Sequence, residues 1–210
     1  MDLADLLTFT GISVMLTLMP GPDILFVIAQ SVTHSRRDGI AVALGLCTGL
    51  VVHTTAAVLG VSALLYHSSV AFQVLKWAGA LYLFILAFQA LREAEEPGGS
   101  EESPLARRHF AALYRRGIFM NLLNPKVSLF FLAFFPQFVS PDAGSVSWQM
   151  AVLGAVFTAQ ALVVFTSVSV ITHRLGRNIL KSATSSKWVN RTKAGIYVLL
   201  GARLVFMERN

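Results

Sequence analysis

Long apolar stretches alternate with short polar connections along the whole chain. Six stretches approach or exceed the roughly 20 residues that a helix needs to cross the hydrocarbon core of a bilayer. They cover residues 6–31, 39–65, 70–91, 117–139, 147–172 and 194–208. The pattern predicts an all-α, polytopic membrane protein with six transmembrane helices. Because the connections are short, we expect a single transmembrane domain over residues 1–210.

Composition supports the same class of protein. Of the 210 residues, 55% are hydrophobic and 13% are charged, whereas soluble domains contain about 25% charged residues. The single cysteine, Cys47, lies inside the second stretch, which excludes an intramolecular disulfide and a cysteine-based metal cluster. The sequence also lacks HExxH and P-loop motifs. We therefore expect no metal ion, no cofactor and no enzymatic activity.

The positive charges follow the positive-inside pattern of membrane proteins. Thirteen of the 17 lysines and arginines lie in three alternate connections. They are Arg36, Arg37, Arg92, Arg107, Arg108, Arg115, Arg116, Arg174, Arg177, Lys181, Lys187, Arg191 and Lys193. The connections at 66–69 and 140–145 contain none. This alternation predicts cytoplasmic basic loops and both termini outside, and it explains the net charge of +6 without nucleic-acid binding.

The longest of these connections, residues 92–116, begins with glutamates around Pro97, Gly98 and Gly99 and then becomes basic. Its first half has the composition of a flexible, solvated linker. A regulatory role is the alternative.

Helix-breaking residues interrupt the first and fourth stretches near their middle. The two segments are Pro20-Gly21-Pro22-Asp23 and Asn124-Pro125-Lys126. A proline inside a helix costs about 3 kcal/mol, and an aspartate at the centre of a membrane helix costs roughly 2.5–3.5 kcal/mol. Broken backbone is tolerated in a bilayer only where it is buried in protein or lines a watery cavity. We predict that both breaks border a binding site, with purely architectural kinks as the alternative.

The two broken stretches occupy equivalent places in the chain. Each begins a half of three predicted spans, and PDILFVIA at 22–29 aligns weakly with PKVSLFFLA at 125–133. Because three is odd, the predicted topology makes the halves two inverted three-helix repeats. Interrupted helices at corresponding places in inverted repeats are typical of transporter sites near the bilayer midplane.

Asp23 and Lys126 each stand directly after a break. Charged residues inside a membrane are costly and are functional candidates by default. The two side chains can clamp a zwitterion, with Asp23 on the ammonium group and Lys126 on the carboxylate. The alternative is a structural ion pair that holds the two halves together.

Each proline also removes the hydrogen bond to the carbonyl four residues earlier. We therefore expect Pro20 to free the carbonyl of Leu16, Pro22 that of Leu18, and Pro125 that of Asn121. Freed carbonyls beside the breaks are candidate ligands for an ammonium group.

Other polar residues inside the spans have two interpretations each. His53, in the second span, has the ordinary pKa of about 6.5 that suits a proton relay to Asp23, or it is a structural partner of a neighbouring helix. Gln160, in the fifth span, either lines a polar path or joins helices by hydrogen bonds. Asn124 is expected to cap the interrupted backbone or to contact substrate. Gly45 and Gly49 permit close helix approach, within the chain or in a homodimer.

The motifs at these positions resemble those of the LysE/RhtB superfamily of amino-acid exporters. PGPDILFVIAQ in the first span and NLLNPKVSLFFLAFFPQF at 121–138 are similar to two motifs of that family. GLCTGLVVH at 45–53 and KWAGALYLFILAFQALR at 76–92 are also similar. The resemblance extends through about the first two thirds of the chain, with its motifs in the family's order.

The resemblance implies a secondary transporter of a bacterial plasma (inner) membrane. Such a protein exports amino acids or close analogues from the cytoplasm, driven by the proton gradient. Because Asp23 is the only acidic residue at depth in the predicted spans, we expect a neutral or small polar amino acid rather than a cationic one. A small-solute channel and an intramembrane enzyme built on Asp23 and His53 are the alternatives.

Overall fold

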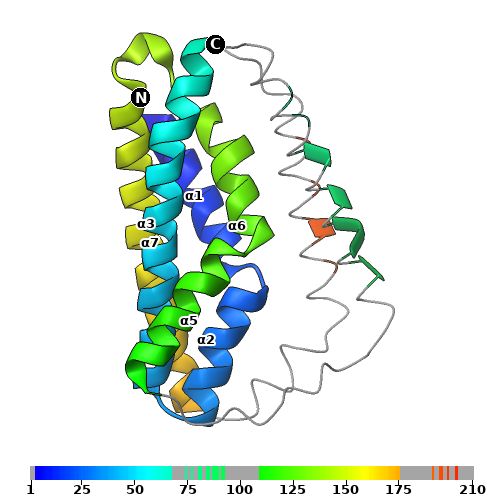
Figure 1. The fold of residues 1–210 in the computed structure, drawn as a ribbon. Coiled ribbons are helices and arrows are strands. Elements are labelled where there is room, and N and C mark those ends of the chain that lie inside the picture. The colour runs from blue at the N-terminus through cyan, green and yellow to red at the C-terminus, as the bar shows by residue number, and fades with distance from the viewer. Residues whose placement is uncertain are drawn as a thin grey trace.

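The computed structural model describes residues 3–67 and 109–175, together with isolated positions between 74 and 92 and between 191 and 202. Its elements are helical throughout the described part of the chain (Figure 1). They are α1 (Leu3–Leu18), α2 (Pro22–Thr33), α3 (Arg36–His67), α5 (Phe110–Leu122), α6 (Pro125–Leu129), η1 (Phe130–Phe134), η2 (Phe135–Phe138), η3 (Pro141–Ala143) and α7 (Val146–Leu175).

The first predicted span is two helices, α1 and α2, separated by a short break. α1 ends at Leu18, and α2 begins with Pro22 in its first position, where a proline is favoured because no intrahelical N–H donor is needed. Gly21 between them is extended, with φ of −163° and ψ of 178°. The axes of the two helices differ by 56°, so this span is broken at proline as predicted.

The fourth predicted span is broken in the same way. α5 ends at Leu122, α6 begins at Pro125, and the axis bends by 49°. Asn124 caps α6 because its Oδ1 accepts a hydrogen bond of 3.0 Å from the backbone N–H of Lys126, which confirms its predicted capping role. Beyond α6 the chain continues as the π-helical turn η1 and the 3₁₀ turn η2.

α3 and α7 are the long, unbroken helices of the described structure, and they pack against each other and against the broken pairs. Within the described residues, these two are long and apolar enough to cross a membrane, and the number rises to four if each bent pair is one span. They correspond to the spans predicted at 6–31, 39–65, 117–139 and 147–172. The spans predicted at 70–91 and 194–208 lie outside the described residues, apart from isolated positions.

The two broken helices run in opposite directions (Figure 1). α1 lies above α2, whereas α5 lies below α6, so the chain descends through the first break and ascends through the second. Contacts between Asp23 and Asn121 and between Lys126 and Leu16 bring the two breaks together. This arrangement is what inverted repeats require of their first helices, while the inversion of the complete halves stays a prediction.

The small residues Gly45 and Gly49 bring α3 close to α5. A Cβ atom at Gly45 would collide with the Tyr114 carbonyl, and one at Gly49 would lie 2.6 Å from Oδ1 of Asn121. Gly117 on α5 faces Gly45 and is equally crowded. The glycine pair therefore serves packing within the chain, and the homodimer stays a prediction.

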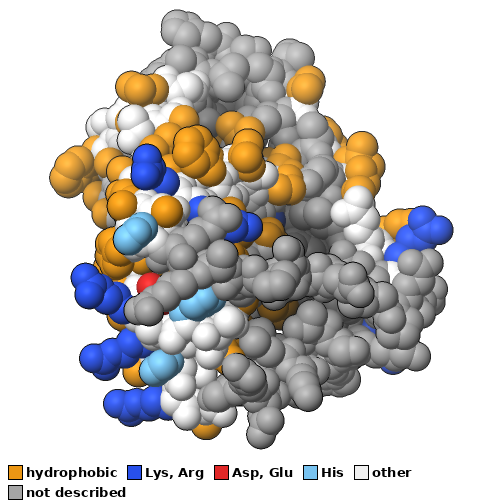
Figure 2. Space-filling model, turned by 60° about the horizontal axis from the view of Figure 1, so that its bottom comes forward, with side chains coloured by type: hydrophobic (Ala, Val, Ile, Leu, Met, Phe, Trp, Pro, Cys, Tyr) orange, Lys and Arg blue, Asp and Glu red, His pale blue; other side chains and the backbone are white. Residues whose placement is uncertain are grey.

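Basic side chains gather at one end of the helices, where α2 ends, α3 and α5 begin and α7 ends. Figure 2 brings this end forward and shows arginine or lysine side chains along one side of it. The guanidinium of Arg116 lies 4.6 Å from the centre of the Phe26 ring, and that of Arg37 lies 5.9 Å from the Phe110 ring. The ends of the predicted basic loops thus meet on one side of the molecule.

Single-cysteine labelling tests whether the end with the basic side chains faces the cytoplasm. In a Cys47→Ala background, Ser145→Cys at the opposite end should react with a membrane-impermeant maleimide in intact cells. His109→Cys, which is exposed just before α5, should react only after the cells are made permeable. Labelling of His109→Cys in intact cells would reverse the predicted topology.

Candidate functional site

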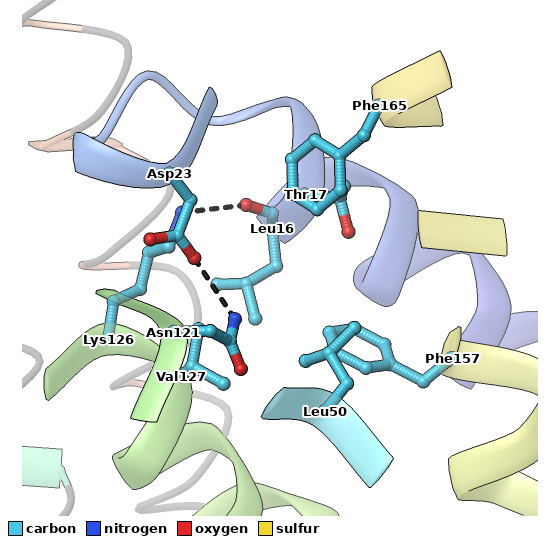
Figure 3. Close-up of a pocket in the computed structure, with 9 residues that line it drawn as sticks. All are labelled: Leu16, Thr17, Asp23, Leu50, Asn121, Lys126, Val127, Phe157 and Phe165. Atoms are coloured by element: carbon cyan, nitrogen blue, oxygen red, sulfur yellow. Dashed lines mark hydrogen bonds between the residues drawn. The ribbon is translucent and has the colours of Figure 1, made fainter. Parts of the chain in front are cut away.

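The two breaks meet at a small cavity in the middle of the molecule (Figure 3). Its walls come from six helices, and the lining residues are Leu16, Thr17, Asp23, Leu50, Asn121, Lys126, Val127, Phe157 and Phe165. The cavity has a volume of about 20 Å³, which is room for one water molecule and not for an amino acid. An amino acid can enter only if the surrounding side chains move.

Lys126 reaches across the cavity from α6 to the end of α1. Its Nζ donates a hydrogen bond to the carbonyl of Leu16 at 3.0 Å (Figure 3). A second, longer bond of 3.4 Å goes to the carbonyl of Met19. Leu16 is the residue whose carbonyl Pro20 was predicted to free, because residue 20 has no N–H to offer it. The Leu16 carbonyl therefore accepts a hydrogen bond from the ammonium group of Lys126 itself. Its role as a ligand for the ammonium group of a substrate stays a prediction.

Asp23 lies in the first turn of α2, where the partial positive charge of the helix N-terminus favours a carboxylate. Its side chain is only 3% exposed. Its Oδ2 accepts a hydrogen bond of 3.1 Å from Nδ2 of Asn121 (Figure 3). Asn121 therefore acts on the carboxylate of the other half, a contact that the sequence did not predict.

Three buried polar atoms around the breaks have no hydrogen-bond partner within the described structure. They are Oδ1 of Asp23, Oδ1 of Asn121 and Nδ2 of Asn124. Buried polar groups are rarely left unpaired, because each costs roughly 1–3 kcal/mol. The side chain of Asn124 still lies close enough to Asp23 to interact with its carboxylate, although without the geometry of a hydrogen bond. A ligand that carries both donors and an acceptor would replace this poor contact with well-formed hydrogen bonds.

His53 contacts the second break from α3. Its Nε2 lies 3.3 Å from the carbonyl oxygen of Asn121, and its ring stacks on Phe131 with 5.4 Å between the ring centres. Pro125 offers the carbonyl of Asn121 no N–H, but the backbone N–H of Asn124 donates to it at 3.0 Å, so the prediction that this carbonyl is left free is wrong. This position suits the structural interpretation of His53, and its role as a proton relay stays a prediction.

Gln160 joins α7 to α1. Its Nε2 donates a hydrogen bond of 3.0 Å to Oγ1 of Thr17, which lines the cavity, while its Oε1 is buried without a partner in the described structure. The interpretation as a link between helices is therefore confirmed, and contact with substrate stays a prediction. Of the other predicted residues, Pro20, Gly21 and Pro22 form the first break and Pro125 begins α6.

A cluster of packed aromatic rings borders the cavity through Phe157. The rings that contact one another belong to Phe9, Phe130, Phe131, Phe134, Phe135, Phe138 and Phe157. Phe157 belongs both to this cluster and to the cavity wall, and it stacks on Phe130 with 5.2 Å between ring centres. Phe157 and Phe165 were not predicted, although their spacing of eight residues on a helix places them on one face.

Comparison with known proteins identifies relatives over nearly the whole chain. A family model described as LysE type translocator matches residues 14–208. A protein of Salmonella typhimurium named homoserine/homoserine lactone efflux protein is 34% identical over 193 residues, which are 91% of each chain. An uncharacterized membrane protein of Vibrio cholerae is 33% identical over 85% of this chain and 86% of its own. No solved structure matches.

Proposed function

The chain belongs to the LysE type translocator family, and on this premise we propose that it exports amino acids or close analogues from the cytoplasm. It is a secondary transporter in the inner membrane of a bacterium, coupled to the proton gradient, with both termini outside. The substrate binds between the two helix breaks, at the cavity that contains Asp23 and Lys126. The family and the apolar helices support the membrane setting.

The observation that carries this proposal is the set of unpaired polar atoms at the breaks. An ammonium group donates hydrogen bonds and carries positive charge, and it suits Oδ1 of Asp23 and Oδ1 of Asn121. A carboxylate accepts hydrogen bonds, and it suits Nδ2 of Asn124 and an N–H group of Lys126, which is a donor whether the amine is protonated or neutral. An α-amino acid has both groups on one carbon, so a single ligand satisfies both halves of the site.

The cavity walls favour a short, uncharged side chain. Among the described residues that line it, Asp23 is the one carboxylate, and the other walls include Leu50, Val127 and Phe157. Because Asp23 is engaged by the ammonium group, a cationic side chain would be left without a partner. Thr17 with Gln160 offers a polar wall for a hydroxyl group. Homoserine, which the Salmonella relative's name contains, has this chemistry.

A small-solute channel remains the alternative function, because a constriction built from broken helices also occurs in channels. Unitary currents in planar bilayers would favour the channel. Turnover of a substrate by the purified protein would favour the intramembrane enzyme.

The test of export is amino-acid retention in cells. Bacteria with and without the protein are loaded with dipeptides that release homoserine, threonine, leucine or lysine inside the cell. We expect the protein to lower the intracellular level of one or more of the neutral amino acids and to leave lysine unchanged. Equal retention of all four with and without the protein would contradict the proposed function.

A further inference from the structure

The position of the Lys126 ammonium group is unusual for a substrate-binding lysine. It lies against two backbone carbonyls at the end of α1, those of Leu16 and Met19. A carboxylate ligand is bound by hydrogen-bond donors, whereas these carbonyls are acceptors. The end of α1 is therefore a cation site, and in this structure the cation is supplied by the protein.

The local backbone is shaped to admit this cation. Pro20 withholds the N–H that would otherwise occupy the Leu16 carbonyl. The backbone at Gly21 also passes close to this cation, since a Cβ atom there would lie at a contact distance of 3.4 Å from Nζ of Lys126. Pro20 thus acts on Lys126 directly, beyond the bend of 56° at the break.

A substrate ammonium group needs the same place. Asp23, Leu16 and Lys126 line one cavity of about 20 Å³, so there is no room for an amino acid while Lys126 is bound to the carbonyls. Two ammonium groups on one set of acceptors would also repel each other, and that repulsion is strong away from water. Only one cation can occupy the site at a time.

We propose that Lys126 carries the proton that is exchanged for substrate, an inference that rests on the proposed function. On the cytoplasmic side, the substrate ammonium group takes the place of the Lys126 ammonium group at the carbonyls of Leu16 and Met19. Lys126 then gives one proton to cytoplasmic water and becomes a neutral amine. On the outer side, the substrate leaves, and Lys126 takes one proton from external water and returns to the carbonyls.

The surrounding charges are consistent with this exchange. Asp23 on α2 is close enough to Lys126 and to His53 on α3 for their charges to act on it. α1, α5 and α7 contribute Thr17, Asn121 and Phe157 to the cavity. In this proposal Asp23 stays ionised throughout, and its charge balances either the ammonium group of Lys126 or that of the substrate. This assigns the transported proton to an ammonium group, whereas the sequence pointed to the carboxyl group of Asp23 with His53 as its relay.

The closing experiment measures proton release when L-homoserine binds to the purified, detergent-solubilised protein. A pH indicator in weak buffer reports the protons, and calorimetry reports the affinity at several pH values. The parent protein should release one proton for each homoserine bound. Its affinity should increase with pH by up to about tenfold per unit, because protonated Lys126 competes with the substrate. 4-Hydroxybutanoate, which lacks the amino group, should release none.

Two variants of Lys126 test whether this residue is the source of the released proton. Lys126→Met leaves the carbonyls without a competing cation, so it should bind homoserine without proton release and with an affinity that no longer rises with pH. Lys126→Arg keeps a charge that cannot be removed, so it should bind at least about tenfold more weakly, again without release. Asp23→Asn should still release a proton for each homoserine that it binds at high concentration.

The possible results distinguish this inference from the proposed function. Homoserine binding without proton release in the parent protein would overturn the role of Lys126 and leave the exporter intact. Proton release that persists in Lys126→Met would also overturn the role of Lys126 without contradicting export. If none of the neutral amino acids binds to the parent protein, the proposed function and this inference both fail.

Discussion

Asp23→Asn is expected to abolish efflux driven by the proton gradient. The carboxylate is buried, accepts from Asn121 and lines the cavity. Removing one partner of a buried charge pair costs roughly 2–5 kcal/mol, so the amino acid should bind at least ~30-fold more weakly. Asparagine has nearly the same shape, so we expect the variant to fold and to reach the membrane.

The matched control for this prediction is Asp142→Asn. Asp142 is an exposed aspartate in η3, away from the cavity, and its loss should leave efflux at the parent rate. Efflux of radiolabelled homoserine from energised cells, normalised to the amount of protein in the membrane, gives both values. Parent-like efflux by Asp23→Asn would remove this carboxylate from the mechanism.

Pro20→Ala is expected to weaken substrate binding without destabilising the protein. Alanine restores an N–H at residue 20, which can extend α1 by one hydrogen bond to the carbonyl of Leu16. That bond competes with Lys126, and later with the substrate, for the same acceptor. Because Pro20 lies beyond the last residue of α1, its replacement should leave the protein at least as stable, while homoserine affinity should fall by about tenfold or more.

Pro22→Ala provides the comparison within the same segment. Pro22 is the first residue of α2, and N–H groups in the first turn of a helix have no intrahelical partner. An alanine there restores no bond inside α2, so its effect on affinity should be smaller than that of Pro20→Ala. Both variants are measured for thermal unfolding and homoserine binding in one detergent. Reduced stability with native affinity in Pro20→Ala would make the break purely architectural.

The sequence predicted the broken helices because proline has a local and unambiguous effect. Pro20, Pro22 and Pro125 have no N–H donor, and the first and fourth predicted spans are broken at these residues. The predicted spans at 39–65 and 147–172 agree with α3 and α7 because long apolar runs have few alternatives in a bilayer. The π-helical turn η1 had no such signal, because its residues, FFLAF, are equally compatible with an α-helix.

The sequence identified charged residues of the site but not the contacts that these residues make. Intramembrane charge identified Asp23 and Lys126, and both line the cavity. The sequence could not assign Lys126 to the carbonyl of Leu16, because a long flexible side chain reaches several acceptors and only the bend between α1 and α2 decides among them. The contact of Asn121 with Asp23 joins residues 98 positions apart, and no local pattern indicates such a pair.

The sequence also did not predict which helix packs against Gly45 and Gly49. Gly45 and Gly49 form a motif that permits close approach of any second helix, and the pattern does not say whether that helix belongs to the same chain. The structure places Gly117 and Asn121 of α5 against them. Because Asn121 also contacts Asp23, this close approach positions part of the site, and the glycines affect function through it.

Homoserine accumulation in liposomes tests the central claim, that this chain exchanges an amino acid for protons, most directly. Purified protein is reconstituted into liposomes whose lumen is more acidic than the outside solution, with labelled L-homoserine outside. The account predicts accumulation inside above the external concentration, its collapse on addition of a protonophore, and none in protein-free liposomes. With Asp23→Asn, the rate of accumulation should fall at least ~30-fold at homoserine concentrations below its Kd. Homoserine that only equilibrates across the membrane, at a rate and to a level independent of the pH gradient, would contradict it.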